Sequence, residues 1–173
     1  MKKKIKVILA ALAVTTMVGC TTKDTKPEMT EEETKEYKQS FIDAENMNKA
    51  KDGKVLKERL DIISSFIGST GSQISTYMEN GDKLNTTAYA SGVVNNDDRD
   101  DVDEAMTELP QKMTSEQGLN LSKRVTNLYF EYMAIMTDIA EGKITPELND
   151  RISNLNKDLN NLDEVLTDMS NNQ

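Results

Sequence analysis

The residues best suited to chemistry are few, because the sequence contains a single cysteine, Cys20, and no histidine. Zinc, copper and haem iron are bound chiefly by histidine and cysteine side chains. Serine and cysteine nucleophiles usually depend on a histidine base. We therefore expect no transition-metal site, no bound cofactor and no catalytic residue of these kinds, which leaves the carboxylates and one thiol.

The 30 aspartate and glutamate residues could supply a hydrolase with paired carboxylates. Such an enzyme needs one acid that an apolar setting keeps protonated and one that stays ionised. The candidates, Glu131 and Asp138 among them, lie at polar positions of a helical pattern without a distinguishing motif, and no tryptophan is present to stack on a sugar. The sequence favours solvated carboxylates on helix surfaces and predicts that the protein is not an enzyme, with a cell-wall hydrolase as the alternative.

Acidic residues also gather at positions 95–101, Asn-Asn-Asp-Asp-Arg-Asp-Asp, where a calcium site is conceivable. A calcium loop of the EF-hand type has oxygen ligands at alternate positions, glycine at the sixth and glutamate at the twelfth. In a loop that starts at Asp97, Glu108 has the twelfth place, but Arg99 takes a ligand position and Val102 the glycine position. The pattern therefore indicates a solvated loop followed by the start of a helix.

The N-terminal segment combines four lysines within its first six residues, an apolar run over residues 7–18 and then Cys20. This order is typical of a secretory signal, and the run is shorter than the roughly 18 to 20 residues of a permanent membrane helix. Residues 17–20, Met-Val-Gly-Cys, resemble the lipobox of bacterial lipoprotein precursors. The resemblance implies that residues 1–19 are removed as a signal peptide and that the Cys20 sulfur receives a diacylglycerol, whose two chains hold the protein on the extracytoplasmic face of the cell membrane. An ordinary secretory signal, the alternative, would leave Cys20 as a free thiol.

The mature chain is strongly acidic. The signal peptide carries four of the 21 basic residues and none of the 30 acidic ones, which leaves 17 against 30 and a formal charge of about −13. This charge excludes nucleic acid as a partner and repels anionic lipid headgroups. We expect the protein to contact the membrane through the lipid on Cys20 and to bind another protein of the cell envelope.

The polar residues 20–29, which include Pro27, predict a flexible tether, and residues 30–173 predict one all-α domain, a bundle of four to five helices. Thr30 and Glu33 have the spacing of a capping box. A first helix over residues 31–50 is expected to bury Tyr37, Phe41 and Met47.

A second helical pattern follows residue 53 and ends near Asn80-Gly81. Glycines at positions 68 and 71 predict a kink or break within it, because each costs about 1 kcal/mol relative to alanine inside a helix. Two short helices are expected within residues 82–109. The apolar face of the second helix comprises Leu56, Leu60, Ile63, Phe66, Ile67, Ile74, Tyr77 and Met78.

The C-terminal part contains the strongest helical patterns, and both repeat apolar residues at steps of four and three. The first begins after a capping-box spacing at Thr114 and Gln117 and ends at Gly142; the second begins at Thr145-Pro146. The short connection predicts an antiparallel hairpin. The residues that flank the apolar repeat of the second of these helices offer little complementary charge. They therefore favour packing of this repeat within the core of one chain over a coiled-coil contact between two chains. The stripes comprise Leu121, Val125, Leu128, Tyr132, Ile135 and Ile139, and then Leu148, Ile152, Leu155, Leu159, Leu162, Leu166 and Met169.

Phe130 lies about 200° around its helix from Leu128, opposite the main stripe. It is either core beneath a third helix or an aromatic contact for a partner. For the whole chain we expect a non-catalytic interaction or accessory protein of the envelope. The alternatives besides the hydrolase are a solute-binding accessory of a transporter, for which no strand pattern is evident, and release of residues 13–19 as a signalling peptide.

The lipobox interpretation predicts that Cys20→Ala abolishes lipid attachment, because the chain offers no other thiol to form the thioether. Metabolic labelling with palmitate should mark the parent protein and not the variant. Equal labelling of the two would refute this interpretation.

Overall fold

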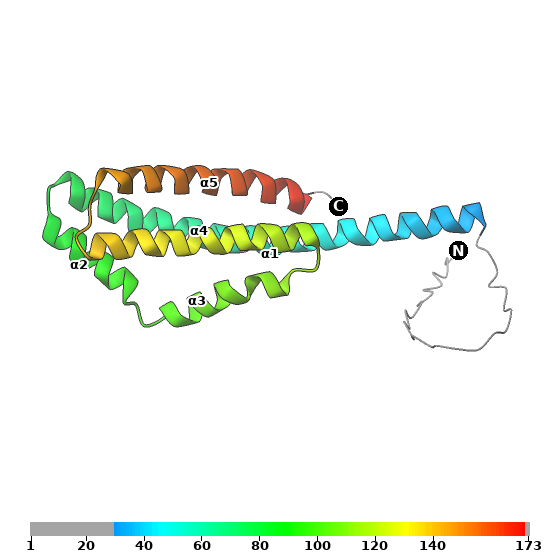
Figure 1. The fold of residues 1–173 in the computed structure, drawn as a ribbon, viewed down its shortest axis with the longest axis horizontal. Coiled ribbons are helices and arrows are strands. Elements are labelled where there is room, and N and C mark those ends of the chain that lie inside the picture. The colour runs from blue at the N-terminus through cyan, green and yellow to red at the C-terminus, as the bar shows by residue number, and fades with distance from the viewer. Residues whose placement is uncertain (1–29, 172–173) are drawn as a thin grey trace, which may run out of the picture.

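The computed structural model describes residues 30–171, and all of their regular secondary structure is helical (Figure 1). In chain order the elements are α1 (Glu31–Glu79), α2 (Lys83–Val94), α3 (Arg99–Glu108), the 3-10 helix η1 (Leu109–Lys112), α4 (Glu116–Ala140) and α5 (Pro146–Asn171). The predicted all-α bundle is confirmed, as is the antiparallel hairpin, which α4 and α5 form.

Helix α4 is the centre of the bundle, because it packs against α1, α2 and α5 and also contacts α3 and η1. This arrangement explains why apolar side chains surround so much of its circumference. Its buried apolar residues are Leu121, Val125, Leu128, Tyr129, Tyr132, Met133, Ile135, Met136 and Ile139. The predicted α5 stripe also lies in this core: Leu148, Leu155, Leu162, Leu166 and Met169 are buried, and Ile152 and Leu159 are partly buried against them.

The predicted division of the N-terminal region is wrong, because residues 31–79 form one continuous helix. Gly68 and Gly71 lie within α1 without breaking it. Ile67 and Ile74 on either side of them are buried in the core. Burial of such side chains contributes about 1.5 to 3 kcal/mol each, which outweighs the helix-propensity cost of the two glycines.

The helix ends are set by local hydrogen bonds and by glycine. The capping box of α1 is confirmed: the Glu33 amide donates to Thr30 Oγ1 at 3.2 Å, and the Thr30 amide donates to Glu33 Oε2 at 2.8 Å. α1 and α4 are followed by Gly81 and Gly142, whose φ angles of 68° and 76° place them in the left-handed region that glycine adopts at little cost.

The second predicted capping box is wrong, because Ser115 and not Thr114 is the N-cap of α4. The Ser115 hydroxyl accepts a hydrogen bond from the Gly118 amide at 2.9 Å. Thr114 is instead bound by Asp52 of α1, a residue that is only 2 % exposed. The Asp52 carboxylate accepts from the amide and hydroxyl of Thr114, at 3.0 and 2.9 Å, and from the amide and hydroxyl of Ser115, both at 2.7 Å.

Burial raises the pKa of Asp52, but its hydrogen bonds with Ser115 and Thr114 lower the pKa more, and the net pKa lies below the ordinary value of 3.8. The carboxylate also occupies the positive end of the α4 dipole. Asp52 thus fastens the start of α4 to the middle of α1.

Two glycines let the helices approach at this point. A Cβ on Gly118 would collide with the Asp52 carboxylate, and a Cβ on Gly53 would lie 2.9 Å from the backbone of Met169 and Ser170. Asp52 and Gly53 therefore hold the start of α4 and the end of α5 at one level of α1.

The two short helices predicted within residues 82–109 are confirmed as α2 and α3. Asp103 of α3 accepts a hydrogen bond from the Tyr129 hydroxyl of α4 at 2.7 Å and pairs with Arg99 at 3.3 Å. Burial, and then the bond with Asp103, raise the pKa of Tyr129, so the hydroxyl remains a donor at neutral pH. This bond attaches α3 to the centre of the bundle.

We predict that Asp52→Asn lowers the free energy of unfolding at neutral pH by about 2 to 3 kcal/mol, because a neutral amide replaces a charged acceptor and turns a donor toward backbone N–H groups. The folded-state pKa of Asp52 is depressed, so its stabilisation is complete above the ordinary pKa of 3.8 and is lost as the pH falls through the folded-state value. Urea unfolding should therefore show parent and variant converging below about pH 3.8.

Asp158→Asn, at an exposed aspartate of α5, is the matched control and should change stability little. A parent-to-variant difference at position 52 that stays constant from pH 7 to pH 2 would contradict an ionised Asp52.

Candidate interaction surface

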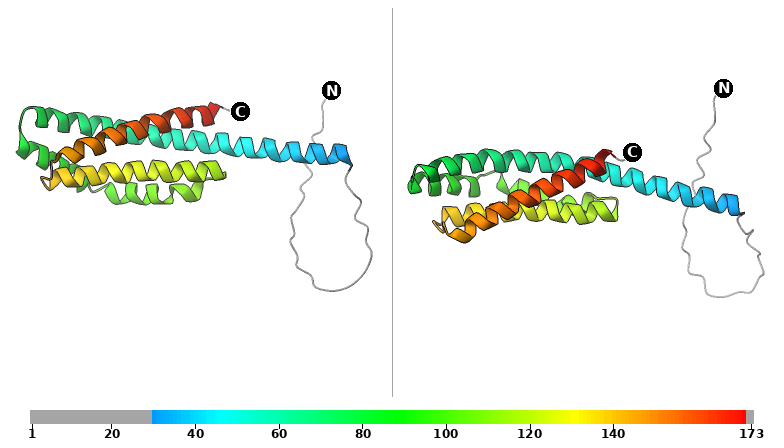
Figure 2. Two further views of the ribbon diagram at one scale, coloured as in Figure 1. Left: turned by 45° about the horizontal axis from the view of Figure 1, so that its top comes forward. Right: turned by 90° about the horizontal axis from the view of Figure 1, so that it is seen from above.

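The part of α1 that precedes Ala50 lies outside the bundle. Figures 1 and 2 show it running past the start of α4 and the end of α5. Only its base, at Glu45 and Lys49, faces the first turns of α4. Ala50 is the first buried residue of α1. We call residues 31–49 the arm.

The prediction that Tyr37, Phe41 and Met47 form core is wrong, because these side chains are 46 %, 57 % and 73 % exposed. The physical reason is the length of the other helices. α4 begins and α5 ends beside Asp52 and Gly53. The first turns of α4 face only the base of the arm, at Glu45 and Lys49. The large apolar side chains of the arm are therefore exposed to solvent, because no neighbouring helix of the described chain covers them.

The arm presents aromatic rings and an uneven charge. The Tyr37 and Phe41 rings meet edge to face, with centroids 4.7 Å apart. Ile42, 51 % exposed, lies on a different side of the helix. Acidic residues predominate at the tip, where Glu31, Glu32, Glu33 and Glu36 accompany Lys35 and Lys38. Basic residues predominate at the base of the arm and in the turns after it, where Lys49, Lys51, Lys54, Lys57 and Arg59 accompany Glu45, Asp52 and Glu58.

The arm is held helical by its ends and by local pairs. The Thr30 backbone and hydroxyl bonds lower the pKa of Glu33, so this carboxylate is ionised in the capping box. Gln39 donates to Asp43 at 2.9 Å, and Lys49 pairs with Glu45 at 2.7 Å. The arm also continues a helix whose other half is packed, which removes the cost of starting a new helix.

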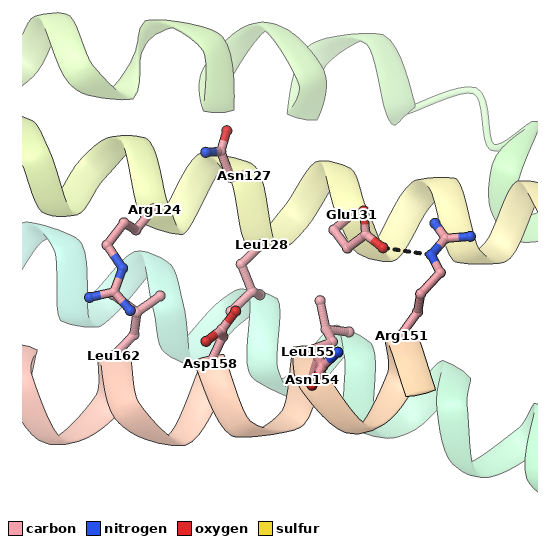
Figure 3. Close-up of a pocket in the computed structure, with 9 residues that line it drawn as sticks. All are labelled: Arg124, Asn127, Leu128, Glu131, Arg151, Asn154, Leu155, Asp158 and Leu162. Atoms are coloured by element: carbon pink, nitrogen blue, oxygen red, sulfur yellow. Dashed lines mark hydrogen bonds and ion pairs between the residues drawn. The ribbon is translucent and has the colours of Figure 1, made fainter. Parts of the chain in front are cut away.

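A cleft of about 420 Å³ lies between α4 and α5 (Figure 3). Leucines from both helices form part of its lining, and the remaining residues are polar or charged. Its lining residues are Arg124, Asn127, Leu128, Glu131, Arg151, Asn154, Leu155, Asp158 and Leu162.

The two carboxylates named as hydrolase candidates share one arginine. Arg151 Nε donates to Glu131 Oε1 at 2.8 Å, and Arg151 Nη1 donates to Asp138 Oδ2 at 2.5 Å. The hydrogen bonds with Glu131 and Asp138 raise the pKa of Arg151. The arrangement joins α4 to α5 and gives neither carboxylate the apolar setting that would keep a general acid protonated.

Phe130 lies on the outward side of α4, and no helix within residues 30–171 buries it fully. Its side chain is 37 % exposed, and its ring meets Tyr129 at a centroid distance of 5.2 Å. Its role as a partner contact stays a prediction.

The acidic segment over residues 95–101 forms the turn before α3 and the first turn of that helix. Asp97 and Asp98 are exposed. Arg99 turns back and donates from Nη1 to the Val94 carbonyl at 2.9 Å. Within residues 30–171, no three acidic side chains come together in the manner of a metal site.

Cys20, the signal peptide at 1–19 and the tether at 20–29 lie outside the described residues. Among the helices that the structure does describe, none has the length and hydropathy of a membrane span.

Comparison with known proteins gives no relative. No family model, no curated protein and no solved structure matches the chain.

The exposure of the arm was missed at the level of sequence, although a signal was present. In α5 the apolar residues recur without interruption at steps of four and three. The only large apolar side chains within residues 31–49 are Tyr37, Phe41, Ile42 and Met47. An apolar stripe this sparse is typical of a helix without full burial.

We predict that Phe130→Ala lowers the melting temperature of the bundle only slightly, with a stability loss below about 1 kcal/mol, because the ring is partly exposed. Tyr129→Ala, at the neighbouring buried ring, should cost about 3 to 5 kcal/mol. Thermal unfolding followed by circular dichroism compares the two. Equal losses would show that Phe130 is core.

Proposed function

We propose that the protein is a lipid-anchored, non-catalytic interaction protein on the extracytoplasmic face of a bacterial membrane, and that its arm is the element that contacts a partner. The observation that carries the proposal is the arm itself, a helical segment outside the bundle with Tyr37, Phe41 and Met47 exposed. An amphipathic helix that presents spaced apolar anchors is a common means of protein recognition.

Energetics support a binding role for the arm over a structural one. Its apolar side chains gain nothing from the bundle, because Ala50 is the first residue of α1 that the bundle buries. Aromatic side chains are frequent anchors of interfaces, since each removes a large apolar area from water upon binding. The exposed rings of the arm therefore favour association with another surface.

The position of the arm also supports the proposal. Nine residues lie between the lipidation candidate Cys20 and Thr30, where the described helix is capped. In a lipidated protein the arm is thus the part of the fold closest to the membrane, and the acidic bundle follows behind it. A partner in or on the same membrane would meet the arm first.

A non-catalytic role is supported by the state of the carboxylates. Arg151 binds both Glu131 and Asp138, and Asp52 is fully engaged with Thr114 and Ser115. Glu131, Asp138 and Asp52 therefore join helices of the bundle, which supports a structural role for these three carboxylates.

The proposal predicts that a photo-crosslinking amino acid at Phe41, in the full-length protein in its native membrane, forms adducts with a protein partner. Mass spectrometry of the adducts identifies the partner. The same amino acid at Lys157, an exposed position of α5 within the bundle, is the matched control.

An adduct yield at Phe41 no higher than at Lys157 would remove the support for a partner-binding arm. Phe41→Glu should prevent co-purification of the protein identified in the adducts. It should leave the melting temperature of the bundle unchanged, because Phe41 is exposed. A variant that melts much earlier would mean that Phe41 has a structural role.

A further inference from the structure

One face of the arm has a repeat that is symmetric about its middle. Exposed residues recur along this face at alternating steps of four and three, which places them in one line on a helix. In order they are Glu33, Tyr37, Ser40, Ala44, Met47 and Lys51. Phe41 borders the line next to Tyr37.

The midpoint of this line falls at position 42. Met47 follows the midpoint at the same separation by which Tyr37 precedes it, and Ser40 and Ala44 are likewise equidistant. When two such helices run antiparallel with position 42 of one beside position 42 of the other, Tyr37 of each copy lies opposite Met47 of the other copy. Ser40 of each copy likewise lies opposite Ala44 of the other copy. The small residues at the centre let the helix axes approach closely, because the distance between packed helices depends on the side chains at the contact.

The charges at the ends of the line are complementary in the same register. Glu33 of one copy meets Lys51 of the other at each end. In this register the acidic tip of one arm, residues 31–36, lies along residues 48–53 of the other, which include Lys49 and Lys51. A parallel pair would instead bring the acidic tips together and set two acidic bundles side by side.

We propose that the arms of two copies of this chain pair antiparallel about position 42, so that the partner of the arm is a second copy. The inference rests on the proposed function in that the arm is the contact element. Antiparallel pairing keeps the two bundles at opposite ends. An isologous contact of this kind closes on itself as a dimer.

The membrane makes a small interface sufficient. Two chains anchored in one membrane meet at a high effective concentration, which strengthens a contact too weak to persist in dilute solution. A stretch of ten residues spans at most about 35 Å, comparable with the roughly 30 Å length of the arm. Both lipids of an antiparallel pair can therefore reach the same bilayer even when one arm tip stands a full arm length farther from it than the other.

The test is disulfide cross-linking of the full-length, membrane-anchored protein. Two differently tagged copies, one with Tyr37→Cys and the other with Met47→Cys, are produced together and mildly oxidised. In the antiparallel register these positions are opposite, whereas either position is about 15 Å along the axis from its own counterpart in the other copy. The tagged heterodimer should exceed each homodimer at least tenfold.

Lys38→Cys with Asn46→Cys is the matched control, because these positions are also equidistant from position 42 but lie off the contact face. Abundant homodimers of Tyr37→Cys would overturn the antiparallel register, and cross-linking of the control pair at equal yield would overturn the contact face.

A charge exchange tests the same register without cysteine. Glu33→Lys alone should reduce photo-crosslinking between copies from position 41, and Glu33→Lys with Lys51→Glu in one chain should restore it. Adducts from Phe41 with a different protein, together with no disulfide between copies, would refute self-pairing and leave the partner-binding arm intact. Absence of both would refute the two proposals together.

Discussion

The hydrogen bonds of a single buried carboxylate determine where this bundle begins. Burying an ionised aspartate is costly unless its oxygens are fully bound, and Asp52 meets that condition through the amides and hydroxyls of Thr114 and Ser115. The carboxylate can enter only because Gly118 has no side chain, and Gly53 beside it admits the end of α5. One turn of α1 therefore fixes the start of one helix and the end of another.

The arm is a consequence of this constraint. Since α4 and α5 are both fastened at the level of Asp52 and Gly53, the turns of α1 before Ala50 bury no side chain in the bundle. The helix nevertheless continues to a well-formed capping box at Thr30. A helix that is capped and continuous, yet exposes aromatic side chains, is suited to contact another molecule. In our account the bundle is the scaffold and the arm is its binding element.

The sequence predicted what periodicity controls and missed what depends on the lengths of packed neighbours. The unbroken stripes of α4 and α5 predicted the core and the hairpin, because a dense repeat of steps of four and three gives each helix one continuous apolar face that must be buried. Tyr37 and Phe41 were misassigned because apolar character alone does not reveal whether another helix reaches that level of the chain. The role of Asp52 was also hidden, since its partners lie 62 and 63 residues away. Within the candidate surface, Phe130 was recognised as lying off the main stripe, but only the fold shows that no described helix covers it.

We propose that the arm contributes to association and not to the stability of the bundle. The most direct measurement compares urea unfolding of the monomeric, unlipidated chain 30–173 with that of a chain truncated to begin at residue 47, which keeps Asp52 and the turn before it. We expect the two free energies of unfolding to agree within about 0.5 kcal/mol, as for changes at exposed positions. A loss of several kcal/mol upon truncation would contradict it, because the arm would then be part of the folded core.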